Sequence, residues 1–472
     1  MPMHLLLSDI VEITGGKLIA GDPSRPVGSF STDTRTLQPG DFYLGLKGPN
    51  FDGSKFAGEA FRKGALGVMV QRRPPRLRIP SGKCLLRVDD VETAMGEVAS
   101  LWRRKLNPLV LAVMGSSGKT TTKEMIAHIA SQQCQLVATK RNFNNTIGVP
   151  LTLFDLDETT ELLVVEIGMN THGELRRLAQ ITDPDFLVVT NIGRSHIGMF
   201  GSQEQLIRAK AEVFEMIRPE CALVINDDCS LTPAFMDYAM HQHPVIRFGT
   251  EKKLDVCASD ICANPSGGYD FDLFINEETK ERVSLPIYGR YNVHNALASI
   301  AAMLVLDMDF SRIDQWFLDF KPASMRSETL EQNGVRIISD CYNANPDSVI
   351  QSLSSLYDTP REGRTYIVLG DMLELGSLSR VLHEEVGAVF KNMEVNLLVT
   401  YGDLAGFIGE EAARWGQDTF HAETHEEIAM LLFERLKPGD TVLIKGSRLM
   451  ELERVTERLI ERLKSGVLVN QE

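Results

Sequence analysis

A glycine-rich segment between a predicted strand and a predicted helix constrains this chain more than any other feature. Residues 109–114 are apolar (LVLAVM), residues 115–120 read GSSGKT, and residues 120–132 have helical spacing. Such a turn directs backbone N–H groups and the positive end of the helix toward phosphate oxygens. Lys119 would neutralise the β- and γ-phosphates, and the Thr120 hydroxyl would reach Mg²⁺. The common phosphate loop has glycine where this chain has Val113, so a glycine-rich turn without a ligand is the alternative.

The segments around this loop predict a parallel sheet covered by helices. Short apolar strands recur at helix-length intervals (LLVVEIG, FLVVTNIG and CALVIND), which is typical of such sheets. The alternation in YDFDLFIN predicts an antiparallel addition, and NVHNALASIAAMLVL predicts a buried helix.

Two boundaries divide the chain into three predicted domains. The character of the sequence changes at Asn107-Pro108 and at Lys321-Pro322, which gives domains at 1–106, 107–321 and 322–472. The first is a small mixed α/β domain, and the second is a parallel-sheet domain with the phosphate loop. The third, with strands VRIISD, TYIVLGD, NLLVTYG and TVLIKGS, is a Rossmann-like α/β domain without a GxGxxG turn. The predicted fold class is therefore α/β with three domains.

Two polar residues follow predicted strands of the central domain. Glu166 closes LLVV, where a nucleotide-hydrolysing site needs an acid near Mg²⁺, and His196 follows FLVVTNIG at the edge where open α/β sheets bind ligands. On sequence alone, the alternative for Glu166 is a carboxylate that merely faces water, and the alternative for His196 is a structural histidine.

Charge and hydropathy narrow the partners. Lys and Arg number 49 against 64 Asp and Glu, a net charge of −15, which disfavours nucleic acid and anionic lipid. The N-terminus lacks the pattern of a signal peptide, and no apolar stretch is long enough to span a bilayer. We expect a cytoplasmic monomer with no membrane insertion and no nucleic-acid partner.

Several segments together resemble the Mur ligase family, the ATP-dependent amide-forming enzymes of peptidoglycan synthesis. GSSGKTTTK resembles the family's short phosphate loop, TNIGRSH its TNI-x-x-x-H segment, and RAKAE its Ala-Lys-x-Glu segment. Four further segments resemble the members that join D-alanyl-D-alanine to UDP-N-acetylmuramoyl-tripeptide: NFNNTIGVPLTL, DCYNANPDS, LGDMLELG and LIKGSR. The resemblance runs from about Thr32 to Glu453.

The resemblance implies a set of residues for ATP and metal. The ATP phosphates would be held by Gly115, Ser116, Ser117, Gly118, Lys119, Thr120 and Thr121. Thr120 and Glu166 would meet one Mg²⁺, and His196 with a carbamylated Lys210 would help to hold a second. A free lysine is cationic and would repel Mg²⁺, whereas a carbamate supplies an oxygen ligand. Without the resemblance, Lys210 reads as a solvated helix lysine.

The resemblance also implies contacts to the remaining parts of the substrates. Asn295 would contact adenine, Arg326 would reach ATP, and Asp340 would lie near the ribose; Tyr291 stands where many relatives have histidine. The UDP end would be held by Asp33, Thr34, Arg35 and Lys47, the muramoyl-peptide would face Asn144 and Asn145, and the dipeptide would approach Tyr342, Asn343 and Asn345. Turn formation is the alternative role for these Asn and Asp residues.

The implied reaction has two steps, with an acyl phosphate formed from ATP and then attacked by the dipeptide amine. Three alternatives remain open. The first is a ligase of the same family that adds one diamino acid; such ligases usually carry an Asp-Asn-Pro-Arg segment, which this chain lacks. The second is folylpolyglutamate synthase, which has GKGS in its phosphate loop where this chain has GKTT. The third alternative is a nucleotide-dependent switch or binding protein that forms no amide; a signalling GTPase of this kind would carry an NKxD motif, which the chain lacks.

Overall fold

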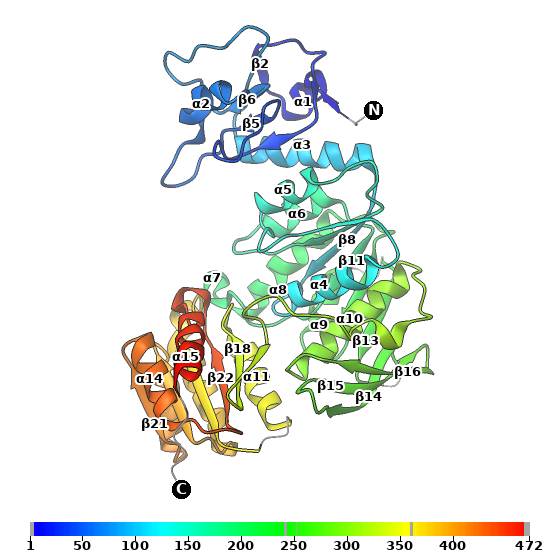
Figure 1. Ribbon diagram of the computed structural model, residues 1–472. Helices are drawn as coiled ribbons and strands as arrows, with labels where there is room; N and C mark the ends of the chain where they lie inside the picture. The colour runs from blue at the N-terminus through cyan, green and yellow to red at the C-terminus, as the bar shows by residue number, and fades with distance from the viewer. Residues whose placement is uncertain (1–3, 240–242, 252, 359–361, 467–472) are drawn as a thin grey trace. The chain divides into compact units, whose positions relative to one another are not determined.

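The computed structural model describes residues 4–239, 243–251, 253–358 and 362–466 (Figure 1). Its contacts define two compact units. The first holds 1–112, 134–185 and 212–221, and the second holds 113–133, 186–211 and 222–472. The division crosses strand β8 (Leu109–Met114), whose last five residues are all buried.

The first unit begins with a five-stranded sheet of order β2-β7-β6-β5-β4, in which only β2 is antiparallel to its neighbour. The 16-residue helix α3 begins where the Asp90 carboxylate accepts a hydrogen bond from Thr93 N, and it ends at Asn107 in the left-handed conformation. The elements of this region are β1 (Leu5–Leu6), α1 (Leu7–Thr14), β2 (Lys17–Ala20), β3 (Pro26–Val27), β4 (Phe30–Ser31), β5 (Phe42–Leu44), α2 (Ala57–Arg62), β6 (Gly67–Val70), β7 (Cys84–Arg87) and α3 (Val91–Leu106).

The rest of the first unit places Glu166 at a strand end. β9 (Leu136–Ala138) and the fully buried β10 (Leu162–Glu166) pair in parallel. In the chain, α5 (Gly148–Phe154) comes between these two strands and α6 (Glu174–Thr182) follows β10. Continuous burial of LLVVE is what a parallel strand covered on both faces requires.

In the second unit, strands β11 to β14 pair in parallel in chain order, and β14, β15 and β16 pair antiparallel. Residues of β15 alternate strictly between buried and half-buried, which confirms the predicted antiparallel strand. The elements of this region are α4 (Lys119–Ala130), β11 (Phe186–Val189), α7 (Ile197–Phe200), α8 (Gln203–Ala211), β12 (Ala222–Asn226), α9 (Thr232–Met236), β13 (Val245–Gly249), β14 (Val256–Ala263), β15 (Tyr269–Ile275), β16 (Glu278–Leu285) and α10 (Tyr291–Val305).

Helix α10 packs against α4, the helix that follows the phosphate loop (Figure 1). Eleven of its fifteen residues are buried, which confirms the predicted buried helix. Polar contacts fix the pair in register, because Asn295 Oδ1 accepts a hydrogen bond from Thr122 Oγ1 and Ser299 Oγ donates to Thr122 O.

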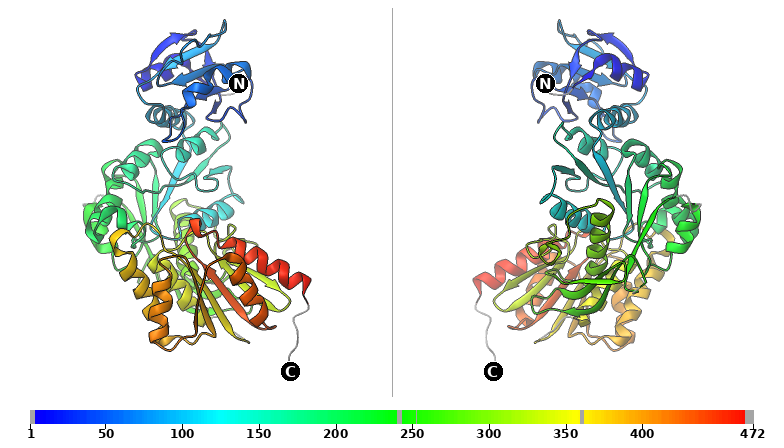
Figure 2. Two further views of the ribbon diagram at one scale, coloured as in Figure 1. Left: turned by 90° about the vertical axis from the view of Figure 1, so that its left-hand side faces the viewer. Right: turned by 90° about the vertical axis from the view of Figure 1, so that its right-hand side faces the viewer.

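The C-terminal part of the second unit is a six-stranded sheet of order β17-β18-β22-β19-β20-β21, parallel except for its edge strand β17. Alternate residues of its inner strands form one apolar cluster with α14 and α15, which cover that face together (Figure 2). The elements are β17 (Glu328–Gln332), β18 (Val335–Asp340), α11 (Pro346–Asp358), β19 (Thr365–Gly370), α12 (Ser379–Val389), β20 (Leu397–Tyr401), α13 (Gly406–Arg414), β21 (Thr419–Ala422), α14 (His425–Arg435), β22 (Thr441–Lys445) and α15 (Glu453–Ser465).

These observations confirm the predicted fold class: a small mixed region, a parallel-sheet region with the phosphate loop, and a Rossmann-like region. Within the described residues, none of the helices has the length and apolar character needed to cross a membrane. The boundaries at 106 and 321 stay predictions.

Candidate active site

Two glycines give the loop after β8 its shape. Gly115 has φ 146° and Gly118 has φ 80°, in the region that side chains disfavour. Space is closed as well: a Cβ on Gly115 would lie 2.0 Å from Thr190 Oγ1, and one on Gly118 would lie 2.3 Å from Asn295 Oδ1. The two glycines therefore let the loop lie flat against β11's end and α10.

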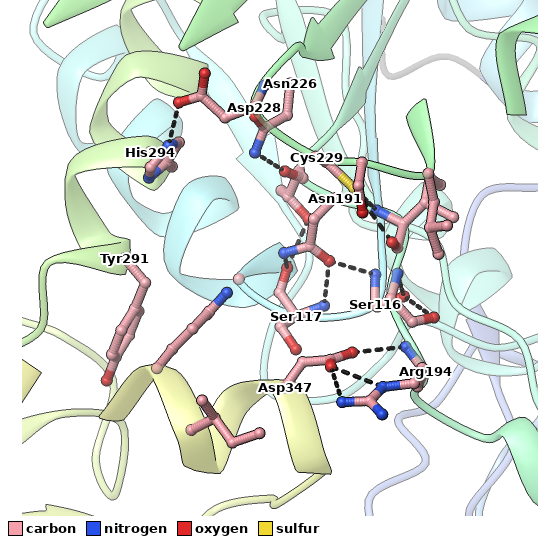
Figure 3. A pocket seen from close by; sticks show the side chains of 18 of the residues that line it. Ser116, Ser117, Asn191, Arg194, Asn226, Asp228, Cys229, Tyr291, His294 and Asp347 are labelled. Atoms are coloured by element: carbon pink, nitrogen blue, oxygen red, sulfur yellow. Dashed lines mark hydrogen bonds and ion pairs between the residues drawn. The ribbon is translucent and has the colours of Figure 1, made fainter. Parts of the chain in front are cut away.

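Asn191 holds the loop from outside. Its Oδ1 accepts hydrogen bonds from Ser116 N (3.1 Å) and Ser117 N (3.0 Å), while its Nδ2 donates to Ser117 O (3.1 Å) (Figure 3). Thr190 Oγ1 also donates to Ser117 O at 2.6 Å. Sequence reasoning missed this asparagine, although its position directly after a buried strand and opposite the loop was a usable signal.

Two lysine amines, those of Lys119 and Lys210, determine the positive charge at and near the loop. Lys119 begins α4, and its Nζ donates a hydrogen bond to Gly115 O at 2.9 Å. Lys210, near the end of α8, is only 3% exposed. Burial and, secondarily, the nearby charge of Lys119 lower the pKa of Lys210 to about 7. Its amine is therefore uncharged in about half of the molecules at pH 7, unlike the cationic, solvated lysine that is the alternative from sequence alone.

His196 lies in the left-handed conformation immediately before α7, with φ 62°. Its Nδ1 lies 2.5 Å from Oε2 of Glu374, and this contact outweighs burial and lowers the pKa of the Glu374 carboxyl. His196 thus projects toward the LGDMLELG segment.

In the first unit, Glu166 and Asn144 come together. Glu166 is 2% exposed, and its Oε1 accepts a hydrogen bond from Asn144 Nδ2 at 2.8 Å. Asn145 has a local structural partner, because its Oδ1 accepts from Ile147 N and Gly148 N at the start of α5.

The four N-terminal candidates occupy one short loop and the turn after β5. Asp33 accepts hydrogen bonds from Arg35, which lower the pKa of Asp33 to about 2. Thr34 is buried and its carbonyl oxygen accepts from Lys63 Nζ, whereas Lys47 is exposed. Arg35 projects into solvent with 86% of its side chain exposed.

Asp340 sits in a polar cluster at the end of β18. Its Oδ2 accepts a hydrogen bond from Lys445 Nζ at 2.6 Å and lies 3.5 Å from the Tyr291 hydroxyl, and Oδ1 accepts from Ser327 N at 3.2 Å. Lys445 also donates to the carbonyl oxygen of Asn343. The Tyr291 hydroxyl therefore has defined partners, since it also lies 2.7 Å from Ser327 Oγ.

Three further predicted residues, Arg326, Tyr342 and Asn345, have defined contacts. The Arg326 guanidinium lies 3.8 Å from the centre of the Tyr342 ring, a cation–π contact. Asn345 Nδ2 donates a hydrogen bond to Ser117 Oγ at 3.1 Å. The phosphate loop and the DCYNANPDS segment are therefore in direct contact.

An ion-pair network that sequence reasoning missed borders the loop. Asp347 accepts three hydrogen bonds from Arg194, at 2.8 Å from N, 2.8 Å from Nε and 2.6 Å from Nη2. Glu385 on α12 accepts two more. Hydrogen bonds to Glu385 and Asp347 raise the pKa of Arg194 despite its burial.

We expect Arg194→Ala to weaken ATP binding on the order of tenfold, because it leaves Asp347 uncompensated beside the phosphate loop. Titration with ADP measures this. Asp347→Asn in the same chain should restore much of the affinity, since it removes the exposed charge. Arg454→Ala, which breaks an exposed pair with Glu451, is the matched control. Unchanged affinity in Arg194→Ala would refute the electrostatic role.

The loop after β8 and some of the segments packed on it line one cavity of about 580 Å³. Ser116, Ser117 and Gly118 line one wall, and Asp347 and Gln351 on α11 line another. Figure 3 shows His294 and Asp228 at the opposite end of the cavity from Arg194 and Asp347. The volume and polar lining suit a nucleotide whose phosphates face the loop.

The described residues contain no cluster of three His, Cys, Asp or Glu side chains fit to hold a metal ion. The donors that the sequence predicts for Mg²⁺ are instead mixed: a hydroxyl at Thr120, a buried carboxylate at Glu166, an imidazole at His196 and an amine at Lys210. Hydroxyl and carboxylate oxygens suit Mg²⁺, whereas an unmodified amine does not.

Comparisons with known families and sequences agree with this geometry. Residues 113–303 match the Mur ligase middle domain, and residues 325–448 match the Mur ligase, glutamate ligase domain. The UDP-N-acetylmuramoyl-tripeptide–D-alanyl-D-alanine ligase of Bacillus subtilis (strain 168) is 34% identical over 435 residues, which cover 91% of this chain and 93% of that protein. The enzyme of the same name from Escherichia coli (strain K12) is 31% identical and covers 97% of this chain and 99% of its own length.

Solved structures show the same similarity. MurF from Acinetobacter baumannii superposes with a TM-score of 0.88 at 28% identity, covering 98% of this chain and 99% of that one. MurF ligase from Thermotoga maritima in complex with ADP gives a TM-score of 0.82 at 26% identity, covering 93% and 98%.

Proposed function

The chain belongs to the Mur ligase family, and on that premise we propose that it joins D-alanyl-D-alanine to UDP-N-acetylmuramoyl-tripeptide at the expense of ATP. The products are the UDP-N-acetylmuramoyl-pentapeptide, ADP and phosphate. One observation carries the proposal: a loop with positive φ angles at Gly115 and Gly118 places Ser116, Ser117 and Gly118 in the wall of a cavity of about 580 Å³, which supports nucleotide binding there. The relatives of the same length supply the choice of acceptor and amine.

In the first step the tripeptide's terminal carboxylate attacks the γ-phosphorus, and the bond to the β-bridging oxygen breaks to give an acyl phosphate and ADP. Backbone N–H groups at the start of α4 and the Lys119 ammonium stabilise the charge on the transferring oxygens. Thr120 and Glu166 are the oxygen donors for a Mg²⁺ ion, which neutralises phosphate charge when bound. Asn191 keeps the loop in shape without touching the reacting atoms.

In the second step the dipeptide amine attacks the activated carbonyl carbon. The tetrahedral intermediate expels phosphate, and the amine nitrogen loses a proton to give the amide. Tyr342, Asn343 and Asn345 receive the dipeptide; the contact of Asn345 with Ser117 supports this assignment, because it sets that segment beside the loop. Arg326, Asp340 and Asn295 contact the nucleotide. The position of Asn295 beside Gly118 of the loop supports its assignment.

The other substrate contacts lie in the first unit. Asp33, Thr34, Arg35 and Lys47 hold the UDP end, and the exposed guanidinium of Arg35 supports a role with the diphosphate. Asn144 and Asn145 face the muramoyl-peptide. In this proposal, the domain at 1–106 binds the sugar nucleotide, the domain at 107–321 binds ATP, and the domain at 322–472 binds the amine substrate.

Lys210 carries a carbamate in the active enzyme. Its neutral amine attacks the carbon of CO₂, an N–C bond forms, and one proton leaves to solvent, which yields an anionic oxygen ligand. The pKa of about 7 supports this step, because only the uncharged amine reacts. With this modification, Lys210 and His196 supply ligands for a second Mg²⁺.

The carbamate predicts a pH dependence. A lowered lysine pKa leaves the reactive neutral amine dominant above about 7, so activity should fall as pH falls through that value. Added bicarbonate should offset the loss on the acid side. The measurement is kcat at saturating substrates from about pH 6 to about pH 8.5, with and without bicarbonate at constant ionic strength. A profile indifferent to bicarbonate at every pH would contradict the carbamate.

Phosphate release from ATP tests the function itself. It is measured with UDP-N-acetylmuramoyl-tripeptide and either D-alanyl-D-alanine, single amino acids or no amine, and the product is identified by mass. We expect release only with the dipeptide, together with the pentapeptide product. Release with a diamino acid on the shorter precursor would move the enzyme one step earlier, and release indifferent to the amine would refute a ligase.

A further inference from the structure

Three residues of α10 face the cavity from one side of the helix. Tyr291, His294 and Asn295 are spaced at i, i+3 and i+4 and all line the cavity that holds the phosphate loop. Asn295 lies directly over Gly118, where a Cβ would come within 2.3 Å of its Oδ1. His294 therefore stands next to the nucleotide space but away from the phosphate wall (Figure 3).

Asp228 selects the tautomer of the His294 ring. Its Oδ2 lies 2.7 Å from His294 Nε2 and also accepts hydrogen bonds from Thr250 N and Thr250 Oγ1, both at 2.9 Å. Burial alone would raise the pKa of Asp228, but these hydrogen bonds outweigh it and lower the pKa. An ionised carboxylate only accepts, so Nε2 of His294 carries the hydrogen of this contact; in the neutral tautomer that this selects, Nδ1 is the acceptor.

Nδ1 is available to a ligand. The side chain of His294 is 29% exposed, and the described residues offer Nδ1 no hydrogen-bond partner. Asn295, its neighbour, uses part of its capacity within the protein, since its Nδ2 donates to Asn292 Oδ1 and its Oδ1 accepts from Thr122 Oγ1; one N–H and one lone pair of the amide remain for a ligand. The base of a nucleotide whose phosphates face the loop would extend toward this end of the cavity, opposite Asp347 (Figure 3).

We propose that His294, oriented by Asp228, selects the nucleobase by accepting a hydrogen bond from a 6-amino purine. A 6-oxo purine presents an acceptor at the same position, so its oxygen would face the Nδ1 lone pair and the pairing would fail. The proposal rests on the proposed use of ATP and adds a residue that discriminates against GTP and ITP. His294 contacts the base, and Asp228 acts through it as a positioning residue.

The test compares binding of ADP and IDP to the full-length enzyme by calorimetry. These nucleotides differ in the amino or oxo group at C6. With IDP, the hydrogen bond to His294 is lost and the 6-oxo oxygen faces the Nδ1 acceptor. We therefore expect the enzyme to bind ADP about tenfold more tightly than IDP. His294→Ala should narrow the preference to within about threefold by weakening ADP, and His294→Gln, which keeps an acceptor, should restore part of it.

Asp228→Ala should narrow the preference in the same direction, and combining it with His294→Ala should add little, because both changes remove one interaction. His421→Ala is the matched control, since that histidine pairs with Thr400 outside the cavity. Thermal unfolding checks that each variant is folded. Equal preference for ADP in the wild type and His294→Ala would overturn the proposal, as would a parallel loss for both nucleotides.

A ribose contact is distinguished by 2′-deoxy-ADP. If His294→Ala no longer weakens binding of this nucleotide, the histidine contacts the sugar and the base assignment is wrong. Selective ADP binding without amide formation would refute the proposed ligase reaction and leave this inference standing. Amide formation at equal rates with ATP and ITP would do the reverse.

Discussion

Lys119→Ala is expected to reduce kcat for amide formation by about a thousandfold or more. In the first step two anions, the substrate carboxylate and the γ-phosphate, must approach each other, and Lys119 is the cation at the start of α4 beside them. The fold should persist, because the structure gives the Nζ group a hydrogen bond to Gly115 O whose loss costs about 1 kcal/mol. Phosphate release and thermal unfolding, measured together, separate the two effects.

A second consequence follows from the coupling of the two lysines. The charge of Lys119 helps to lower the pKa of Lys210, so its removal should raise that pKa and reduce the carbamate at neutral pH. Part of the lost activity of Lys119→Ala should therefore return at higher pH. Lys280→Ala, at an exposed position of β16, is the control for removal of a positive charge. Near-normal amide formation by Lys119→Ala would show that the loop does not serve ATP.

The phosphate loop was accessible from sequence because its chemistry is local. A buried strand, two glycines, Lys119 and a helix follow each other within about twenty residues, and backbone geometry alone forces them together. The same holds for β15 and α10. Apolar and polar residues alternate along the sequence of β15, and the sequence of α10 is almost continuously apolar. Local patterns thus predicted the element types and the fold class.

Pairs that are distant in sequence were not accessible. Arg194 and Asp347 are 153 residues apart, and His294 and Asp228 are 66 apart, so neither pair leaves a local pattern. Each joins two strand-end or helix-start segments that only the tertiary fold brings together. Arg194 stands inside TNIGRSH and Asp347 inside DCYNANPDS, so the segments were noticed while the residues that connect them were not.

For asparagines, the sequence did not separate structural roles from ligand-binding roles. Asn145 was predicted to face substrate, and its Oδ1 also begins α5 by accepting two backbone hydrogen bonds. Asn191 was not singled out, yet it orders the loop through both of its amide atoms. The same side chain caps helices, fills turns and binds ligands, and only its partners decide which.

Lys210→Ala is expected to lower kcat by more than about a hundredfold while ADP binding changes less than about threefold. The reason lies in where the residue acts: Lys210 is on α8 rather than in the phosphate loop, whose shape depends on Gly115, Gly118 and Asn191. Loss of the carbamate removes one anionic ligand for a metal, and the binding surface for the phosphates remains. ADP titration beside kcat therefore separates the two roles.

The modification itself gives the decisive measurement. A ¹³C resonance of a lysine carbamate should appear when the wild-type enzyme is placed in ¹³C-bicarbonate, and it should be absent in Lys210→Met, which keeps the buried volume without the amine. Acetate, a small carboxylate that fits the space vacated in Lys210→Ala, should restore part of kcat but none in Lys210→Met. A fully active wild type without the resonance would show that a neutral amine at Lys210 suffices, and the low pKa would then serve only to keep a second positive charge away from Lys119.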